Sequence, residues 1–333
     1  MLFPSVTGLH RSGQMAAHPL DEMKPSLDVF YSASHEKLRF LTEYFAAPDH
    51  HTIERMQIGW LPTPSSTLWM GRFHNPLGYW NTQFHHGSYL TTAISRPGIV
   101  AFEKYGGVLP MHISGLLLEG STGTPMNYSL SLGIGPKLKA TGLKAVDILN
   151  PTEVHGQLAA SGKLTYQPTA GSTDELGLFA ARTRIPAENL FMTVTMTPVV
   201  TTRPIYAVTQ TLVGVEMNRE FDKLRLISEL YIVQNRVETS IGSESHIFTS
   251  GYLQAEYSIR PEWTLFGRLE DTAGVKGDTY LALRPNFVQS RTATGARLAL
   301  SHQQALKFEV SHSIHQNNTP STQLGLEWSA IFP

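Results

Sequence analysis

The chain has 333 residues, a formal net charge of −1, no cysteine and 16% charged residues, where soluble globular domains carry roughly 25%. The near-neutral balance excludes the basic surface that a nucleic-acid partner requires, and the lack of cysteine excludes disulfides, thiolate metal sites and cysteine nucleophiles. No stretch reaches the ~18 to 20 consecutive apolar residues of a membrane helix.

The N-terminal segment 1–14 contains no basic region followed by an apolar core, so this numbering shows no signal peptide. Segments in which apolar and polar residues alternate, the pattern of β-strands, number fifteen from residue 26 onward. A membrane barrel normally has an even number of strands, so one more is expected near residues 2–10. Sixteen is therefore the predicted count, and fourteen is the alternative if the segment 26–33 or another one is misread.

The main signal along the chain is alternation of large apolar and polar residues in segments of about ten residues. It appears first around 56–60, where Met56, Ile58 and Trp60 share one face. It recurs at 222–234, 253–259, 304–313 and 321–332. A strand with one apolar face and an opposite face of Arg, Glu, Gln, Ser and Gly is typical of a barrel wall between lipid and a water-filled lumen. The pattern predicts an all-β fold, a transmembrane antiparallel up-and-down β-barrel, with residues 1–333 as a single domain.

The connections between these segments alternate in length. Short turns are expected at 33–36, 61–66, 119–124, 168–174, 218–221, 259–262 and 301–304. The intervening connections are mostly longer, at 74–108, 135–154, 186–204, 236–246, 273–287 and 314–320, with one short member at 47–51. Outer-membrane barrels have short periplasmic turns and longer external loops. The alternation therefore predicts a consistent orientation in a Gram-negative outer membrane.

A block within residues 69–108 resembles bacterial outer-membrane porins related to the phosphate-selective porin O/P type. The matching positions are Gly71, Arg72, Phe73, Pro76, Gly78, Trp80, Asn81, His86, Arg96 and Pro97. Residues 287–308 are similar to the penultimate hairpin of such barrels. The resemblance implies a porin fold and a channel with mild anion preference. Family members end in Phe, whereas this chain ends Phe332-Pro333, a departure at the position that assists barrel assembly.

The loop 74–108 is the main candidate functional segment, since a connection of this length is usually functional or disordered, and disordered loops are rarely this rich in aromatic and His residues. We expect it to fold into the lumen as a constriction; the alternative is an external cap over the mouth. The pore residues expected there are Arg72, His74, Tyr79, Trp80, Asn81, His85, His86 and Arg96. Adjacent His85 and His86 point opposite ways in extended chain, so no metal site is predicted.

Further charges are expected on the lumen face of the wall. Together with Arg72 the cations are Arg39, Arg55, Arg225, Arg268, Arg291, Arg297 and Lys307; the anions are Glu43, Glu229, Glu256, Glu270, Glu309 and Glu327. Rings of charge in a pore set ion preference, but cross-strand Arg–Glu pairs can equally hold the wall open. For any single residue other than Arg72, the scaffold role is the preferred interpretation.

The predicted function is an outer-membrane porin for passive diffusion of small hydrophilic solutes or ions. No catalytic motif is present, and neither an enzyme activity nor a cofactor is expected. The expected partners are outer-membrane lipids and small solutes or anions, with either a homotrimer or a partner protein as the assembly. One alternative is a barrel that sheathes or anchors a partner protein; another is a soluble all-β protein.

Overall fold

The computed structural model describes residues 1–12, 22–48, 50–84, 87–103, 106–123, 125–148, 156–169, 172–196 and 199–333. The strands of the first half are β1 (Leu2–Ser12), β2 (Glu22–His35), β3 (Leu38–Ala47), β4 (His50–Thr63), β5 (Ser66–His74), β6 (His112–Ser121), β7 (Met126–Ile134), β8 (Lys137–Lys139) and β9 (Gly142–Lys144). The strands of the second half are β10 (Leu158–Tyr166), β11 (Glu175–Met196), β12 (Val199–Phe221), β13 (Leu224–Thr239), β14 (Gly242–Arg260), β15 (Trp263–Ala273), β16 (Val288–Ser301), β17 (Gln304–His315) and β18 (Pro320–Ala330).

Helices are short. They are α1 (Gly78–Gln83), α2 (Thr279–Ala282) and the 3₁₀ helices η1 (Ser88–Leu90) and η2 (Gly98–Val100). Over the residues that the structure describes, none of the helices is both long and apolar enough to cross a membrane.

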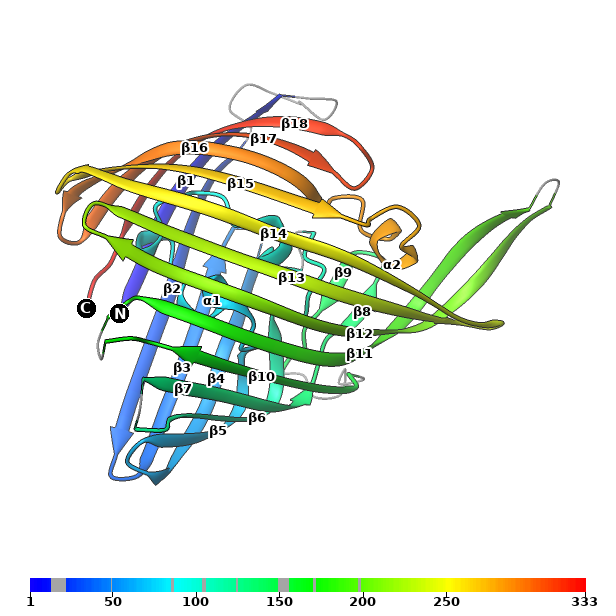
Figure 1. Cartoon of the computed structure of the whole chain (residues 1–333), viewed down its shortest axis with the longest axis horizontal. Helices are drawn as coiled ribbons and strands as arrows, with labels where there is room; N and C mark the ends of the chain where they lie inside the picture. The colour runs from blue at the N-terminus through cyan, green and yellow to red at the C-terminus, as the bar shows by residue number, and fades with distance from the viewer. Residues whose placement is uncertain are drawn as a thin grey trace.

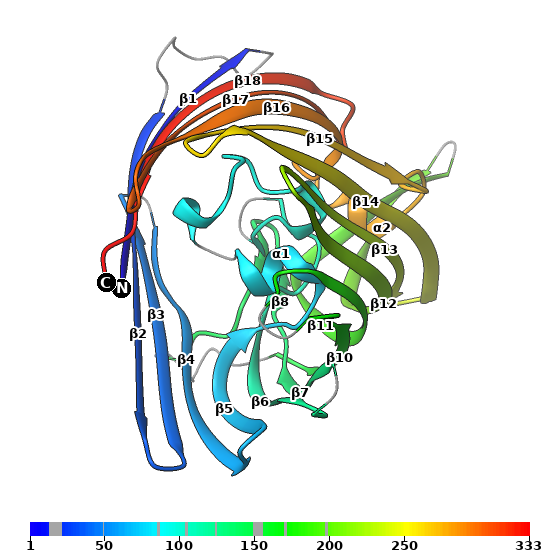
Figure 2. The ribbon, with the colours of Figure 1, turned by 60° about the vertical axis from the view of Figure 1, so that its left-hand side comes forward.

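The strands form a closed antiparallel barrel (Figures 1 and 2). In the described ranges, sixteen strands make up its wall, and β8 and β9 form a small hairpin beside it. Closure is made by the first and last strands, which pair from Ser5 with Ser329 to Ser12 with Thr322. The backbones of Leu2 and Phe332 also exchange two hydrogen bonds, so the termini lie together. The predicted fold class and the count of sixteen are confirmed.

The last two strands show which side chains face outward and which face inward. The paired residues Phe308 of β17 and Leu326 of β18 are 49% and 54% exposed, whereas Lys307 and Glu309, on either side of Phe308, are 1% and 2% exposed. The large apolar side chains therefore lie on the outer surface, and the charged ones lie inside. A strand side chain reverses face at each residue, so this arrangement follows from the alternation itself.

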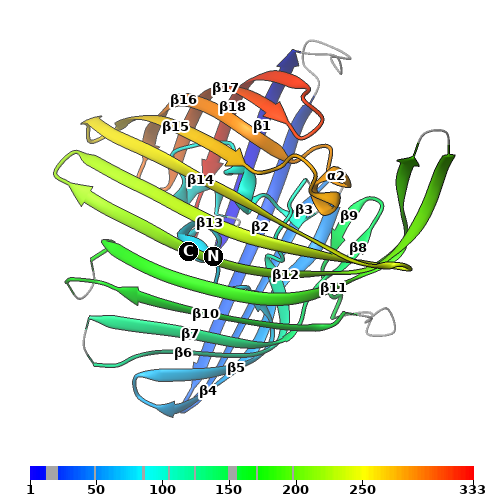
Figure 3. The ribbon, with the colours of Figure 1, turned by 45° about the vertical axis from the view of Figure 1, so that its right-hand side comes forward.

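Two of the predicted long loops are wrong. The segment 236–246 is continuous ladder except for a turn after Thr239, and described residues of 186–204 belong to β11 and β12, which extend beyond the neighbouring strands (Figure 3). Pro186 lies at a register shift between β11 and β12, a position where the missing N–H does not interrupt a regular ladder.

Candidate pore constriction

The longest connection runs from residue 75 to residue 111, between β5 and β6, and contains α1, η1 and η2. In Figure 2 it lies within the ring of strands. One side of it packs on the wall: the rings of Trp80 and Tyr252 meet edge to face with centroids 6.1 Å apart, and Trp80 also meets Phe84 at 5.2 Å. The inner face of β11–β15 is unusually apolar where this packing occurs, with Phe179, Leu212, Ile227, Val233, Phe248 and Phe266 all buried.

Such burial is a strong attachment, because each large apolar side chain taken out of water stabilises by roughly 1.5–3 kcal/mol. From the loop, Leu77, Tyr79, Trp80, Phe84, Ile99, Val100, Val108, Leu109 and Met111 enter the same core. The wall of β11–β15 therefore has apolar side chains on both faces: the outer ones are exposed and the inner ones are covered by the chain's own loop.

Carboxylates of the wall accept hydrogen bonds from the loop backbone. Glu229 of β13 accepts from the Trp80 amide at 2.6 Å, and Glu270 of β15 accepts from the Gly98 amide at 2.6 Å. Glu309 of β17 accepts from the amides of Ile94 and Ser95 at 2.8 and 3.0 Å. Hydrogen bonds to a charged group contribute roughly 1.5–3 kcal/mol each, so these three carboxylates hold the loop along its length.

Cations of the wall donate to the same loop. Arg268 donates to the Ser95 carbonyl at 2.9 Å, and Arg291 donates to the Arg96 carbonyl at 2.7 Å. The remaining contacts are Lys307 with Thr91 Oγ1 at 3.1 Å, Arg297 with the Tyr89 carbonyl at 3.5 Å and Arg225 with the Tyr79 hydroxyl at 2.9 Å. Five of the cations predicted to face the lumen therefore contact the loop. Burial raises the pKa of Tyr79 to about 12, which keeps this hydroxyl neutral.

Four of the predicted pore residues lie together in the loop. Tyr79, Trp80 and Asn81 follow one another in α1, and Arg96 donates to Asn81 Oδ1 at 3.0 Å. The guanidinium of Arg96 also lies over the Phe102 ring, 4.2 Å from its centroid. These contacts connect the first and second halves of the loop.

Arg72 and His74 lie apart from this group, at the root of the loop. Arg72 donates to the Val146 carbonyl at 3.0 Å and lies 3.5 Å from Glu54. His112 bridges Glu54 and Glu103 at 2.7 Å on either ring nitrogen. His74 Nε2 lies 3.6 Å from Glu43 Oε2. These charged groups join β3–β6 to the loop.

The remaining predicted residues have less to do with the loop. Arg55 pairs with Glu43, and Arg39 is exposed near the β2–β3 turn. His85 and His86 lie outside the described residues. Among the residues that are described, no group of three or more His, Asp or Glu side chains could hold a metal ion.

Two cavities lie beside the loop. The first, about 400 Å³, lies between Tyr89, Leu90 and Thr92 of the loop and the turn end of β12–β16. The second, about 190 Å³, lies between the loop residues Thr82, Gln83, Phe84, Gly87 and Leu90 and the inner side of β1–β5, where Asp28, Glu43, Arg55 and His74 line it. Leu90 borders both. We define the first as the vestibule and the second as the slit.

The sequence did not point to Thr82, Gln83 or Leu90 as lining residues. They are ordinary polar and aliphatic residues without a motif, and only the packing of α1 and η1 turns them toward the slit. The carboxylates that bind the loop amides were predicted to face inward, but nothing in a local pattern identifies a partner more than a hundred residues away.

No family model matches the chain, and no curated protein sequence matches it. Solved structures do. The anion-selective porin from Comamonas acidovorans matches with a TM-score of 0.63 at 11% identity, over 100% of this chain and 99% of that one. The outer-membrane channel DcaP of Acinetobacter baumannii matches with 0.60 at 12% identity, over 100% and 96%. The outer-membrane protein OmpT of Vibrio cholerae matches with 0.61 at 8% identity, over 100% and 97%. The chain has the fold of outer-membrane porins.

Proposed function

We propose that the protein is a channel of the bacterial outer membrane through which small hydrophilic solutes diffuse passively. The observation that carries the proposal is the arrangement of a closed barrel with apolar side chains outside and a loop attached to one part of the inner wall. A closed sheet pairs its backbone groups internally, as a lipid environment requires. Sixteen strands can enclose an aqueous channel, and the slit and the vestibule lie between the loop and the wall, where charged side chains line both.

In this proposal residues 1–333 act as one barrel domain, and the loop sets the bore. The narrowest passage is assigned to the slit, where α1 faces Asp28, Glu43 and Arg55 across the lumen. The wall cations and carboxylates that bind the loop keep it in place, so most of them act as scaffold. We also propose that the channel is related to the phosphate-selective porins that its sequence resembles. The proposal includes no catalytic role.

Ion preference is expected to be weak. The vestibule is lined by the cations Lys223, Arg225 and Arg297 and by the anions Glu220, Asp222 and Glu256. Equal numbers of opposite charge give little net field along a pore. The mild anion preference suggested by the porin resemblance therefore corresponds to a small permeability ratio. A reversal potential measured in a salt gradient that shows clear cation selectivity would exclude it.

The test uses the absence of cysteine from the chain. Gln83 is exposed and lines the slit, so a single Gln83→Cys variant can be modified by a bulky thiol reagent within a planar bilayer. We expect stable conductance steps before modification and a marked reduction after it. The matched control is Gln303→Cys in the β16–β17 turn, also exposed and away from the slit. Unmodified barrels without stable steps would refute the channel function. Equal responses of the two variants would refute only the place of the constriction.

The alternative function, a sheath around a partner protein, is disfavoured by the same geometry. The inner wall of β11–β15 is already covered, and a partner threaded there would have to displace a buried apolar core and the hydrogen bonds to Glu229, Glu270 and Glu309. A sheath without its partner should also conduct erratically or not at all.

We propose a homotrimer as the assembly. One similar structure, of Vibrio cholerae OmpT, is described as a trimer form; it matches with a TM-score of 0.55 at 8% identity. Native mass spectrometry of the detergent-solubilised protein tests this directly, and a monomer at all concentrations would contradict it.

A further inference from the structure

An outward-facing polar groove interrupts the apolar surface of the barrel on β11–β14. Gln234 and Arg236 follow Leu230 and Ile232 on the outer face of β13, while Tyr231, Val233 and Asn235 between them are buried inside. The same change occurs on the neighbouring strands. Going in the same direction along the wall, Val215 and Val213 give way to Thr211 and Thr209 on β12, which runs antiparallel, and Leu176 and Leu178 give way to Arg182 on β11. Ser243 and Ser245 complete the groove from β14.

The strand pairing places these residues in two adjacent rows. Arg182 pairs with Thr211, which pairs with Gln234. In the next row Thr209 pairs with Arg236, which pairs with Ser245. The row directly on the other side consists of Ala180, Val213 and Ile232. The surface therefore changes from aliphatic to cationic and hydroxyl-rich within a single step along β11, β12 and β13, and one row later on β14, where the exposed Ile247 pairs with Gln234.

The change falls at the height where a membrane's headgroups begin. Thr211 lies ten residues from Phe221, the last residue of β12 before a short turn. At a rise of about 3.3 Å per residue and a tilt of about 45°, that length spans roughly 23 Å, close to the ~25 Å apolar band of outer-membrane barrels. The groove is thus expected in the headgroup layer at the end opposite the short turns.

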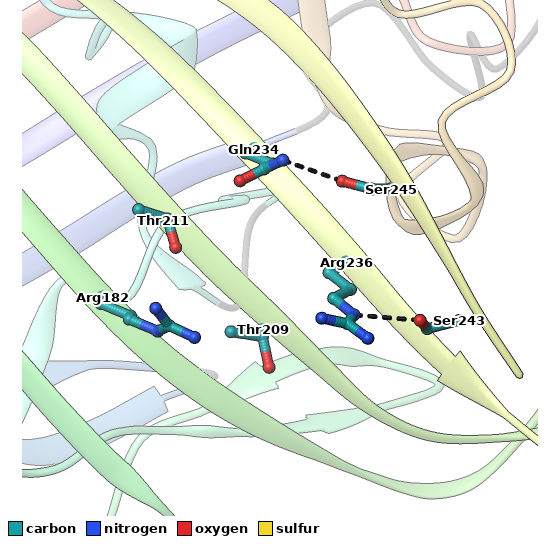
Figure 4. A pocket seen from close by; sticks show the side chains of 7 residues that line it. All are labelled: Arg182, Thr209, Thr211, Gln234, Arg236, Ser243 and Ser245. Carbon is teal, nitrogen blue, oxygen red and sulfur yellow. Dashed lines mark hydrogen bonds between the residues drawn. The ribbon is translucent and has the colours of Figure 1, made fainter.

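The chemistry of the groove suits a phosphate group. Arg236 Nε donates to Ser243 Oγ at 3.0 Å, and Gln234 Nε2 donates to Ser245 Oγ at 3.0 Å (Figure 4). In Figure 4 the guanidinium groups of Arg182 and Arg236 extend toward each other with Thr209 between them. Among the described residues neither arginine has a carboxylate partner, and the groove has a volume of about 440 Å³. Two like charges that face one space favour an anion there, and guanidinium groups match phosphate geometry.

The nearby carboxylate of Glu238 does not neutralise the two groove arginines. Glu238 lies on the same outer face but is paired with Arg184 and accepts from Thr209 at 3.4 Å. Because the charges of Arg184 and Glu238 cancel, Arg182 and Arg236 give this surface its net positive charge.

We propose that this groove binds the phosphate of a lipid headgroup in the leaflet on the long-loop side, with the acyl chains of that lipid lying on the row formed by Ala180, Val213 and Ile232. The inference rests on the proposed membrane location. It does not depend on conduction, because every residue of the groove faces away from the lumen. A phosphorylated lipid fits better than a free anion, since only a lipid uses both the cationic rows and the aliphatic row next to them.

The test measures lipid retention by native mass spectrometry in a non-ionic detergent. The probes are diphosphoryl lipid A, monophosphoryl lipid A, phosphatidylcholine and inorganic phosphate. We expect the native barrel to retain diphosphoryl lipid A in preference to phosphatidylcholine. The double variant Arg182→Gln/Arg236→Gln is expected to bind it at least tenfold more weakly, with monophosphoryl lipid A between the two extremes.

The matched control is Lys37→Gln/Arg260→Gln, which removes the same charge from exposed side chains near the short turns. Equal loss of lipid in both double variants would show that only net charge matters and would overturn the proposal. Displacement of lipid A by inorganic phosphate at millimolar concentration would also overturn it, in favour of a soluble-anion site. Single-channel conductance separates this proposal from the channel function: we expect the groove variant to conduct as the native protein does, and lipid binding by a barrel that conducts nothing would refute the channel alone.

Discussion

Replacing Arg268 with alanine should release the middle of the loop between β5 and β6. Arg268 is 1% exposed and donates to both the carbonyl and the hydroxyl of Ser95, at 2.9 and 2.5 Å. Its guanidinium also lies 5.6 Å from the centroid of the Trp80 ring. Each charge-assisted hydrogen bond contributes roughly 1.5–3 kcal/mol, and the cation–π contact adds roughly 0.5–2 kcal/mol.

The two hydrogen bonds alone have a lower limit of about 3 kcal/mol. Since 1.4 kcal/mol corresponds to a factor of ten in an equilibrium constant, the population in which the Ser95 segment is detached should rise at least ~100-fold. The rest of the loop should stay attached, because Glu229 still accepts from Trp80 and Lys307 still donates to Thr91. The expected change is therefore local opening and not collapse of the barrel.

Opening can be measured by cysteine labelling. Ala93 is fully buried two residues before Ser95, so the labelling rate of Ala93→Cys by a maleimide reports how often this segment detaches. We expect the rate to rise about 100-fold when Arg268→Ala is added, and single-channel traces to show more frequent brief transitions. Arg260→Ala, an exposed arginine of the neighbouring strand β14, is the control. A rise below threefold, with the barrel still folded by its heat-dependent gel migration, would show that Arg268 does not anchor the loop.

Three further changes test other parts of the structure. Leu326→Arg on the outer face should lower the free energy of unfolding in lipid by up to ~2–4 kcal/mol, depending on depth, whereas Leu326→Met should change it little; urea titration in liposomes measures both. Gly71→Ala should strongly reduce folding yield, because Gly71 has φ +139° and an added Cβ would meet the Met56 carbonyl at 2.1 Å; normal yield and stability would contradict that geometry. Lys307→Met should lower the free energy of unfolding by roughly 3–5 kcal/mol, because Glu327 stays buried without its cationic partner at 2.8 Å. Recovery of that free energy in the double variant Lys307→Met/Glu327→Gln would identify the unpaired charge as the cause.

The local pattern of the sequence was sufficient for the barrel and its outer face. Phe308, Leu326 and their neighbours alternate with Lys307 and Glu309, and lipid and water act on successive residues of one strand independently of what lies elsewhere in the chain. The first strand could likewise be inferred, because closure requires an even number. The loop predicted at 186–204 was wrong, because the described residues of this segment belong to β11 and β12, with a register shift between Pro186 and Leu190.

Only the tertiary structure decided what the inward charges do. Arg268, Glu229 and Glu270 have the spacing of pore-lining residues, yet they bind loop groups 149 to 173 positions away in the chain. The apolar inner face of β11–β15 and the outward pair Arg182 and Arg236 depend in the same way on which strands become neighbours. Alternation specifies the face on which a side chain lies, because it is a property of consecutive residues. The partner on that face is specified by barrel closure and loop packing, which bring distant residues together and leave no periodic trace in the sequence.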